Sequence, residues 1–297
     1  MPTLKDYAVA TRPWSFSMSV ISVTLGTLTA WQRGPVHLGW YVAVVAGVVL
    51  CHAAGNVLND YFDDKNRVDV PDSATAKYRP HPIVGGLLSP GAVLAEACVL
   101  FALAAVVGAA AVLVRSPHVL WISLAGLLLT VFYTGGPVTL KYRALGEVAV
   151  FLVWGPLMFL GAYVVQRQAL GWMPLVVSVP FGILVALVLF ANNIRDADQD
   201  RQTGIRTLGT VLGRQRGLAA FSALIVCAYA YTLVAVVAGQ LSPWALLVVL
   251  SVPQAVALVR AFRSHLPDAA DAQTAKLDTL FGLLFVAALV IEGLLHR

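Results

Sequence analysis

The stretch "NVLNDYFDDKNRVD", from Asn56 to Asp69, holds three asparagines and four aspartates in fourteen residues. The residues before it, "LGWYVAVVAGVVLCHAAG" (38–55), carry no acidic or basic Asp, Glu, Lys or Arg side chain. An apolar run of about 20 residues is long enough to cross the hydrocarbon core of a bilayer as a helix. The pattern therefore predicts a transmembrane helix that ends in a dense acidic cluster.

The composition extends this prediction to the whole chain. Of its 297 residues, 59% are hydrophobic and only 12% are charged, and the mean hydropathy is +0.80. A soluble domain carries about 25% charged residues. The ten-residue alternation of a membrane barrel is missing from the sequence, so we expect an all-α, polytopic bundle in a single domain, residues 1–297. Nine segments have the length and apolarity of spans: 14–31, 39–58, 91–114, 118–134, 145–165, 173–193, 217–238, 243–260 and 277–295.

The basic residues predict the orientation of this bundle. If the N-terminus lies inside, sixteen of the twenty Lys and Arg residues fall in inner segments and four in outer ones. Cytoplasmic loops carry such an excess of Lys and Arg. We therefore expect a multi-pass protein of the cell membrane with both acidic clusters on the cytoplasmic side. The same asymmetry accounts for the net charge of +5 without a nucleic-acid partner.

A second acidic cluster, "NNIRDADQD" (192–200), follows the sixth expected span. Taken as continuing helices at 100° per residue, both clusters place their polar side chains on one face. In the first, Asn59, Asp60 and Asp63 fall within about 60° of Asn56. In the second, Asp196 and its neighbours lie close to Asn192 in the same way. Two acidic strips on one side of the membrane are thus expected.

Closely spaced carboxylates repel one another, so a cation must offset them. Oxygen ligands from Asp and Asn favour Mg²⁺, which is usually held by one or two carboxylates together with substrate phosphates. The two strips therefore indicate a clamp for a metal–diphosphate, with neighbouring Lys and Arg binding the remaining phosphate charge. The alternative is that these acids are solvated helix ends balanced by nearby basic residues. The three cysteines lie inside spans, where packing explains them better than a disulfide or zinc site does.

A diphosphate held at the edge of a lipid-embedded bundle suggests an isoprenoid substrate, because its tail is as apolar as a lipid chain. Loss of the diphosphate from the allylic carbon leaves a carbocation, which aromatic faces stabilise. Candidate rings on the inner side are Tyr61, Phe62, Phe132, Tyr133, Tyr142 and Phe190.

Four motifs, in order along the chain, resemble the UbiA superfamily of intramembrane prenyltransferases. They are "TRPWSFSMSV" (11–20), "NDYFDDKNRVD" with the later "YRPHP", "YTGGPVTLKYRALGE" (133–147) and "NNIRDADQDRQTGIRTLG" (192–209). The first and third look most like the MenA branch, which forms menaquinone from 1,4-dihydroxy-2-naphthoate. Ile205 and Arg67 depart from that branch, where lysine and glycine are common. The resemblance implies a nine-helix bundle around a central cavity that opens to lipid and is capped by the acidic loops.

Carried over residue by residue, the resemblance implies specific roles. Metal and diphosphate would be held by Asn59, Asp63, Asp69, Asp196 and Asp200, with Asp60 also in the catalytic set. Substrate would be bound by Arg79, Tyr133, Lys141, Asn192, Asn193 and Arg195. Spacing alone selects a different first motif, Asn56, Asp60 and Asp64. We favour the register from Asn59 to Asp69, because N-D-Y-x-D with a later aspartate fits the branch.

The expected function is Mg²⁺-dependent transfer of a polyprenyl group from its diphosphate to a small aromatic acceptor, 1,4-dihydroxy-2-naphthoate being the first choice. One alternative keeps the fold and the ionisation but cyclises the cation or serves specialised metabolism. Another is a membrane transporter. Transporters usually place their site at the midplane in broken helices, whereas these acids follow the ends of spans.

Overall fold

The computed structural model describes residues 2–68 and 81–295, so the predicted ligands Asp69 and Arg79 lie outside the described residues. Within this range the regular structure is helical, with one isolated bridge between Arg143 and Arg206. The elements are α1 (Leu4–Ala10), η1 (Pro13–Ser15), α2 (Phe16–Trp31), α3 (Leu38–Lys65), α5 (Pro90–Val114), α6 (His118–Thr134), η2 (Leu140–Tyr142), α7 (Gly146–Leu152), η3 (Val153–Leu157), α8 (Met158–Arg167), α9 (Met173–Arg195), α10 (Ala197–Gln202), α11 (Leu208–Val237), η4 (Pro243–Ser251), α12 (Val252–Ser264) and α13 (Ala270–Leu295).

The prediction of an all-helical membrane bundle is confirmed. In the described range, seven helical segments are long and apolar enough to cross a membrane: Leu38–Lys65, Pro90–Val114, Gly146–Arg167, Met173–Arg195, Leu208–Val237, Pro243–Ser264 and Ala270–Leu295. The two other predicted spans are also helical but shorter, α2 with 16 residues and α6 with 17. Several predicted spans end before the observed helices do on the inner side. For example, α3 continues beyond residue 58 to Lys65, because the chain stays helical through the acidic cluster.

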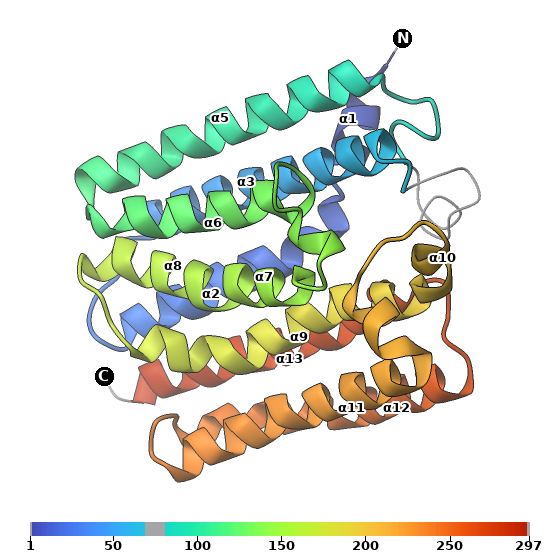
Figure 1. Cartoon of the computed structure of the whole chain (residues 1–297). Helices are drawn as coiled ribbons and strands as arrows, with labels where there is room; N and C mark the ends of the chain where they lie inside the picture. Colours follow the sequence, from blue (N-terminus) through green and yellow to red (C-terminus); the bar gives the residue numbers. More distant parts are fainter. Residues whose placement is uncertain (1, 69–80, 296–297) are drawn as a thin grey trace.

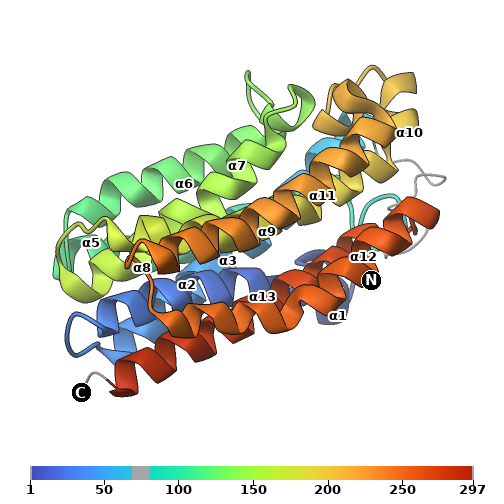
Figure 2. The same cartoon turned by 90° about the horizontal axis from the view of Figure 1, so that it is seen from below.

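The helices run side by side and form successive layers (Figure 1). From the top of that view, α5 packs on α3, α2 packs on α8, and α9 packs against both α13 and α11. Viewed from below, α13 runs beside α2, with α11 and α12 on the outside (Figure 2). The C-terminal ends of α3 and α9 and the short helix α10 meet at one end of the bundle, and α13 ends at the other.

Phenylalanines fill the centre of the half of the bundle built on α9. Seven are fully buried: Phe159, Phe181, Phe190, Phe221, Phe262, Phe281 and Phe285. A small residue lets α13 approach α9 and α2 closely, since a Cβ at Gly282 would lie 2.5 Å from the Phe181 ring and 2.7 Å from Ile21. Such small-residue contacts are typical of helices that pack within membranes.

Local sequence signals explain where several helices begin and bend. Ser89 caps α5 by accepting the Ala92 N–H at 3.3 Å, and Pro90 occupies the first turn, where its missing N–H costs nothing. The span Gly146–Arg167 bends in the middle, where η3 is a π-turn with Gly155 outside the helical region and Pro156 next to it. Pro interrupts the backbone ladder, so a bend at this point is expected.

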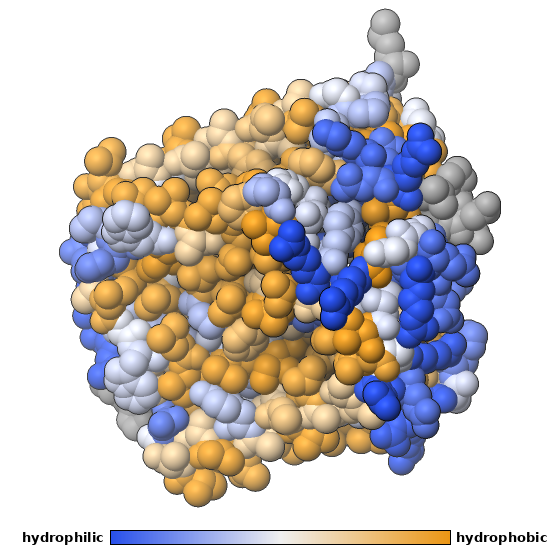
Figure 3. Space-filling view, in the orientation of Figure 1, coloured by the Kyte–Doolittle hydropathy of each residue, from blue (hydrophilic) through white to orange (hydrophobic). Residues whose placement is uncertain are grey.

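The surface separates into an apolar belt and a polar end. Figure 3 shows hydrophobic side chains over the middle of the molecule and hydrophilic ones gathered at the end that carries α10. Helix α5 exposes large apolar side chains along its length, including Leu103, Val106 and Leu113. An apolar face of this size needs a lipid environment. The acidic clusters therefore lie at the boundary between this belt and the polar end.

Candidate functional site

One large cavity, with a volume of about 790 Å³, opens between the helices. Side chains from both acidic clusters line its polar end, whereas apolar side chains from α3, α5, α6 and α8 line the rest. Along α3 the lining runs from Asp63 back to Val44, a length of roughly 28 Å at the rise of a helix. The cavity thus joins a polar rim to an apolar chamber of membrane depth, as expected from the sequence.

Asp63 is the centre of the first cluster. Lys141 Nζ lies 2.6 Å from its Oδ2 and 2.8 Å from its Oδ1, and Tyr142 Oη donates to Oδ1 at 2.8 Å. Asn59 Nδ2 also donates to Oδ2, at 2.8 Å. Thr139 adopts a left-handed backbone, with φ of 44°, at the turn that brings Lys141 over α3. The motif around Asn59 and the loop lysine, which are distant in sequence, are therefore in direct contact.

Asp60, in contrast, is not among the residues that line the cavity in the described structure. It is fully buried in an ion pair with Arg12, and His81 Nε2 lies 3.7 Å from its Oδ1. Arg12 precedes Pro13 and has a left-handed backbone, φ 56°, which turns it toward α3. The projection placed Asp60 on the same face as Asn59 and Asp63, but in the structure its carboxylate is covered by Arg12, which itself lines the cavity.

The two registers of the first motif differ in which of their described residues line the cavity. Asn59 and Asp63, from the register that we favoured, face the cavity, and so does Asn56. Asp60 and Asp64, the two aspartates of the alternative register, do not belong to the described lining.

The second cluster does not form a continuous helix. Helix α9 ends at Arg195, and Asp196 (φ −88°, ψ 0°) separates it from α10. Aspartate favours such boundaries because its side chain competes for backbone hydrogen bonds. The assumption of one helix through Asp200 is therefore wrong, although the break still leaves Asp196 and Asp200 in the cavity lining.

Arg195 has a structural environment that differs from the predicted one. Its guanidinium binds both oxygens of Asp196 at 2.7 Å, donates to the Asp268 carbonyl at 2.5 Å and lies 3.7 Å from Asp271. Among the described residues it joins α9 to the start of α13 and is not part of the cavity lining. In this structure the Arg195 guanidinium therefore does not point into the cavity where a phosphate would bind. It binds the Asp196 carboxylate and orients it.

The two asparagines of α9 lie at the rim. Asn193 donates from Nδ2 to Glu147 Oε1 at 2.8 Å, and both side chains are buried. The Oδ1 of Asn192 is buried and, within the described residues, has no hydrogen-bond partner. A buried carbonyl oxygen without a donor is costly. Asn192 is therefore ready to bind a cation or a donor group of a ligand.

The pKa of Asp200 is affected by charged side chains of both acidic clusters. Burial and the nearby carboxylate of Asp196 raise its pKa to about 6, Asp63 adds to the rise, and Lys141 and a hydrogen bond from Thr207 oppose it. Burial also raises the pKa of Tyr142, with the charge of Asp63 adding to the effect. Carboxylates from α3 and α10 thus lie close enough to disfavour each other's ionised forms.

The donor set fits Mg²⁺ bound together with phosphate. It consists of Asp and Asn oxygens from both clusters. In the part of the chain that the structure describes, no three His, Cys, Asp or Glu side chains form a complete metal site. Mg²⁺ takes few protein ligands and completes its shell with water and substrate phosphates. The three cysteines are free thiols, as expected.

Several lining residues were not predicted as site residues. Arg12, Gln199 and Thr207 reach the polar end, and Trp154 lines the cavity below it. Among the aromatic candidates, only Tyr133 belongs to the described lining, whereas Phe190 is buried against Phe221 in the core. Arg12 could have been suspected, because it follows α1 within the motif "TRPWSFSMSV". Trp154 carries no signal in the sequence other than its position before Gly-Pro.

Comparison with known proteins shows the family of the chain. Residues 19–289 match the UbiA prenyltransferase family. The chain is 32% identical over 291 residues to UbiA prenyltransferase domain-containing protein 1 of Homo sapiens, covering 96% of this chain and 83% of that protein. It is 33% identical to the Drosophila melanogaster homolog over 294 residues, 96% and 79% of the two chains. These relatives do not single out the MenA branch.

Solved structures show the same fold. The apo structure of a UbiA homolog from Aeropyrum pernix K1 has a TM-score of 0.71 at 21% identity, covering 93% of this chain and 97% of that one. A UbiA homolog from Archaeoglobus fulgidus bound to GPP and Mg²⁺ has a TM-score of 0.61 at 14% identity, covering 96% and 99%.

Proposed function

The chain belongs to the UbiA prenyltransferase family and is a prenyltransferase, and we propose that it is a Mg²⁺-dependent enzyme that joins a polyprenyl group to a small aromatic acceptor. One observation supports this most strongly. Polar side chains from two distant parts of the sequence meet at the rim of a single apolar cavity. A substrate with a charged diphosphate head and a long apolar tail matches both ends of that cavity.

In the proposed complex the diphosphate lies between the two clusters. Asn59, Asp63, Asp69, Asp196 and Asp200 would hold the metal, and Lys141, Asn192, Asn193 and Arg79 would bind the diphosphate or the acceptor. When bound, Mg²⁺ neutralises phosphate charge and stabilises the leaving group. Asp60 and Arg195 are assigned supporting roles, since one pairs with Arg12 and the other orients Asp196.

Lys141 has two roles in this proposal. Without ligand, its ammonium balances the nearly buried carboxylate of Asp63. If a bound metal drew on that carboxylate, the Lys141 ammonium would be available to bind phosphate oxygens of the substrate. Lysine suits this exchange because it is a compact charge on a flexible stem.

The reaction is a substitution at the first carbon of the prenyl chain. The allylic C–O bond breaks, and its electron pair leaves with the diphosphate. A carbon of the electron-rich acceptor ring then supplies the electron pair for the new C–C bond, and the proton on that carbon is lost to the released diphosphate. The chain contributes orientation, charge balance and exclusion of water, since the carbon reacts within the apolar cavity.

The membrane arrangement follows from the same cavity. We propose that α2 and α6 cross the bilayer with the seven longer segments, giving nine crossings in one domain. Lining residues of α5 and α6 such as Ala109, Leu113 and Leu120 are also exposed on the outside of the bundle. The prenyl tail would enter from lipid between these helices. The excess of basic residues favours a cell membrane with the rim on the cytoplasmic side.

The test is mass spectrometry of products from purified protein with short and long prenyl diphosphates and a panel of hydroxylated aromatic acceptors, beginning with 1,4-dihydroxy-2-naphthoate. Prenylated product should form with Mg²⁺ and not with EDTA. It should be lost in D63A/D196A and kept in D198N, which changes an exposed acid of α10. Equal turnover in EDTA would refute the proposal, and a cyclic hydrocarbon formed without acceptor would favour the cyclase alternative.

A further inference from the structure

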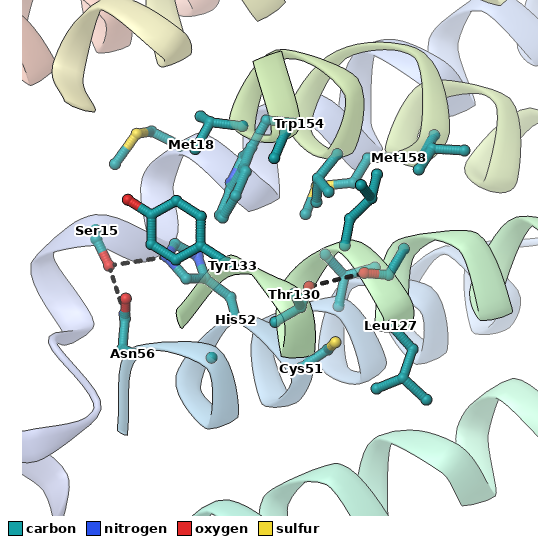
Figure 4. Close-up of a pocket in the computed structure, with 18 of the residues that line it drawn as sticks. Ser15, Met18, Cys51, His52, Asn56, Leu127, Thr130, Tyr133, Trp154 and Met158 are labelled. Carbon is teal, nitrogen blue, oxygen red and sulfur yellow. Dashed lines mark hydrogen bonds between the residues drawn. The ribbon is translucent and has the colours of Figure 1, made fainter. Parts of the chain in front are cut away.

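The cavity wall below the rim carries a group of rings that the proposed chemistry has not yet used. Figure 4 shows Trp154, His52 and Tyr133 in the same part of the cavity wall, between Ser15 and Asn56 at one end and Leu127 and Met158 at the other. The rings come from three different segments: η3, α3 and α6. They lie where the polar end passes into the apolar chamber.

Trp154 is held at three points. Its indole Nε1–H donates to Ser19 Oγ at 3.0 Å, and its backbone carbonyl accepts the Ser22 hydroxyl at 2.6 Å. The His52 ring meets it edge-on, with centroids 4.8 Å apart and an angle of 80° between the planes. Trp154 also lies within the π-turn before Gly155, the kind of helix defect that is frequent at functional sites.

The hydrogen bonds also define the state of His52. Ser15 donates its hydroxyl to the Arg12 carbonyl at 2.8 Å, so toward His52 Nε2, at 3.2 Å, it accepts. Ser19 accepts from Trp154, so its own hydroxyl donates to His52 Nδ1 at 2.8 Å. Every donor then has an acceptor when the imidazole is neutral and carries its proton on Nε2. A neutral ring adds no charge that would oppose a cation in the cavity.

The depth of these rings matches the reacting carbon. His52 precedes Asn59 by seven positions on α3, a rise of roughly 10 Å. A diphosphate held between Asn59, Asp63 and the second cluster occupies the upper part of this distance. The first carbon of the prenyl chain would then lie near the level of Asn56 and His52, and Trp154 is in ring contact with His52.

We propose that the indole face of Trp154 stabilises the positive charge that develops on the allylic carbon as its C–O bond breaks and the electron pair leaves with the diphosphate. Ser19 and His52 are positioning residues that fix the plane of this indole. The inference rests on the proposed transferase function and adds a catalytic residue to it. A ring face attracts a cation through its quadrupole, and the effect is larger where water is excluded.

The direct test changes the electron density of the ring and leaves its shape nearly constant. The chain has seven tryptophans, and all would be replaced by mono-, di- and trifluorotryptophan in the wild type. The expected result is a stepwise fall in kcat, about tenfold across the series, with an unchanged KM for prenyl diphosphate. The matched control is the same series in W154F, where kcat should be independent of fluorination. A flat series in the wild type, in enzyme that turns over normally, overturns the inference.

A second measurement tests the positioning residues. S19A removes the acceptor of the Trp154 N–H, so kcat should fall about threefold to tenfold in the wild type. In W154F, which has no indole N–H, the same change should have a much smaller effect. Equal effects in both backgrounds would contradict a role through Trp154. If the wild type shows no Mg²⁺-dependent transfer at all, the proposed function itself fails, and this outcome is distinct from a flat fluorination series.

Discussion

Replacing Asp200 by Asn should stabilise the ligand-free protein while it weakens the function. Asp200 sits partly buried near Asp196 and Asp63, and its pKa is raised from the ordinary value of 3.8 to about 6. This difference corresponds to about 3 kcal/mol at neutral pH. Since the side chain is only partly buried, solvent screening reduces the expected gain from D200N to about 2 kcal/mol.

The sign of the pH dependence follows from the two pKa values. Between 3.8 and about 6, the folded protein keeps a proton that the unfolded chain has lost, so stability falls as pH rises. Above about pH 6 the whole penalty is present. The advantage of D200N should therefore be small near about pH 4.5 and reach its full size by about pH 7.5.

The assay is reversible unfolding in mixed micelles with increasing SDS, in EDTA, at both pH values. D198N is the matched control, because Asp198 is 87% exposed and its replacement should leave stability unchanged. Addition of Mg²⁺ with an unreactive prenyl thiodiphosphate should reverse the order, since ligand binding stabilises only the protein that binds it well. The reasoning is refuted if D200N is less stable than the wild type in EDTA, or if its advantage does not change with pH.

Three further changes test separate parts of the structure. K141M removes the cation beside Asp63 and should raise the KM for prenyl diphosphate at least tenfold in steady-state kinetics; an unchanged KM would exclude Lys141 from phosphate binding. D60A breaks the buried ion pair with Arg12 and should lower the free energy of unfolding in SDS by about 3–5 kcal/mol. The folded variant should keep most of its turnover. A variant that is inactive but as stable as the wild type would show that Asp60 is a catalytic residue. G209A would place a Cβ 1.9 Å from the Asn193 carbonyl and should lower thermal stability strongly, whereas G91A, with no described neighbour within 4 Å, should not; equal effects would contradict this packing.

The sequence was sufficient for the fold class and for most of the rim. Apolar runs of membrane length determine where helices form, since backbone groups in lipid must be paired within the segment. The helical projection of the first cluster worked because α3 does continue to Lys65, so Asn59 and Asp63 share a face. Resemblance to known motifs added Lys141, which spacing alone could not connect to α3.

Other features depend on contacts between distant segments. The projection cannot tell which neighbour binds each side chain, and Asp60 is covered by Arg12, from 48 residues earlier in the chain. At the helix break, Arg195 donates hydrogen bonds to the Asp196 carboxylate and to the backbone carbonyl of Asp268, which lies 73 residues later in the sequence. Trp154 lines the cavity from a π-turn in the middle of its span, and hydropathy does not report such turns.

Calorimetric titration of the purified protein with an unreactive geranyl thiodiphosphate, in Mg²⁺ and in EDTA, tests the central idea most directly. If Asp63 and Asp196 bind the same metal-bound diphosphate from opposite sides, binding should require Mg²⁺. The affinity should then fall at least tenfold in D63A and also in D196A. Binding of wild-type strength in EDTA, or in either variant, would contradict a shared site between α3 and the α9–α10 junction.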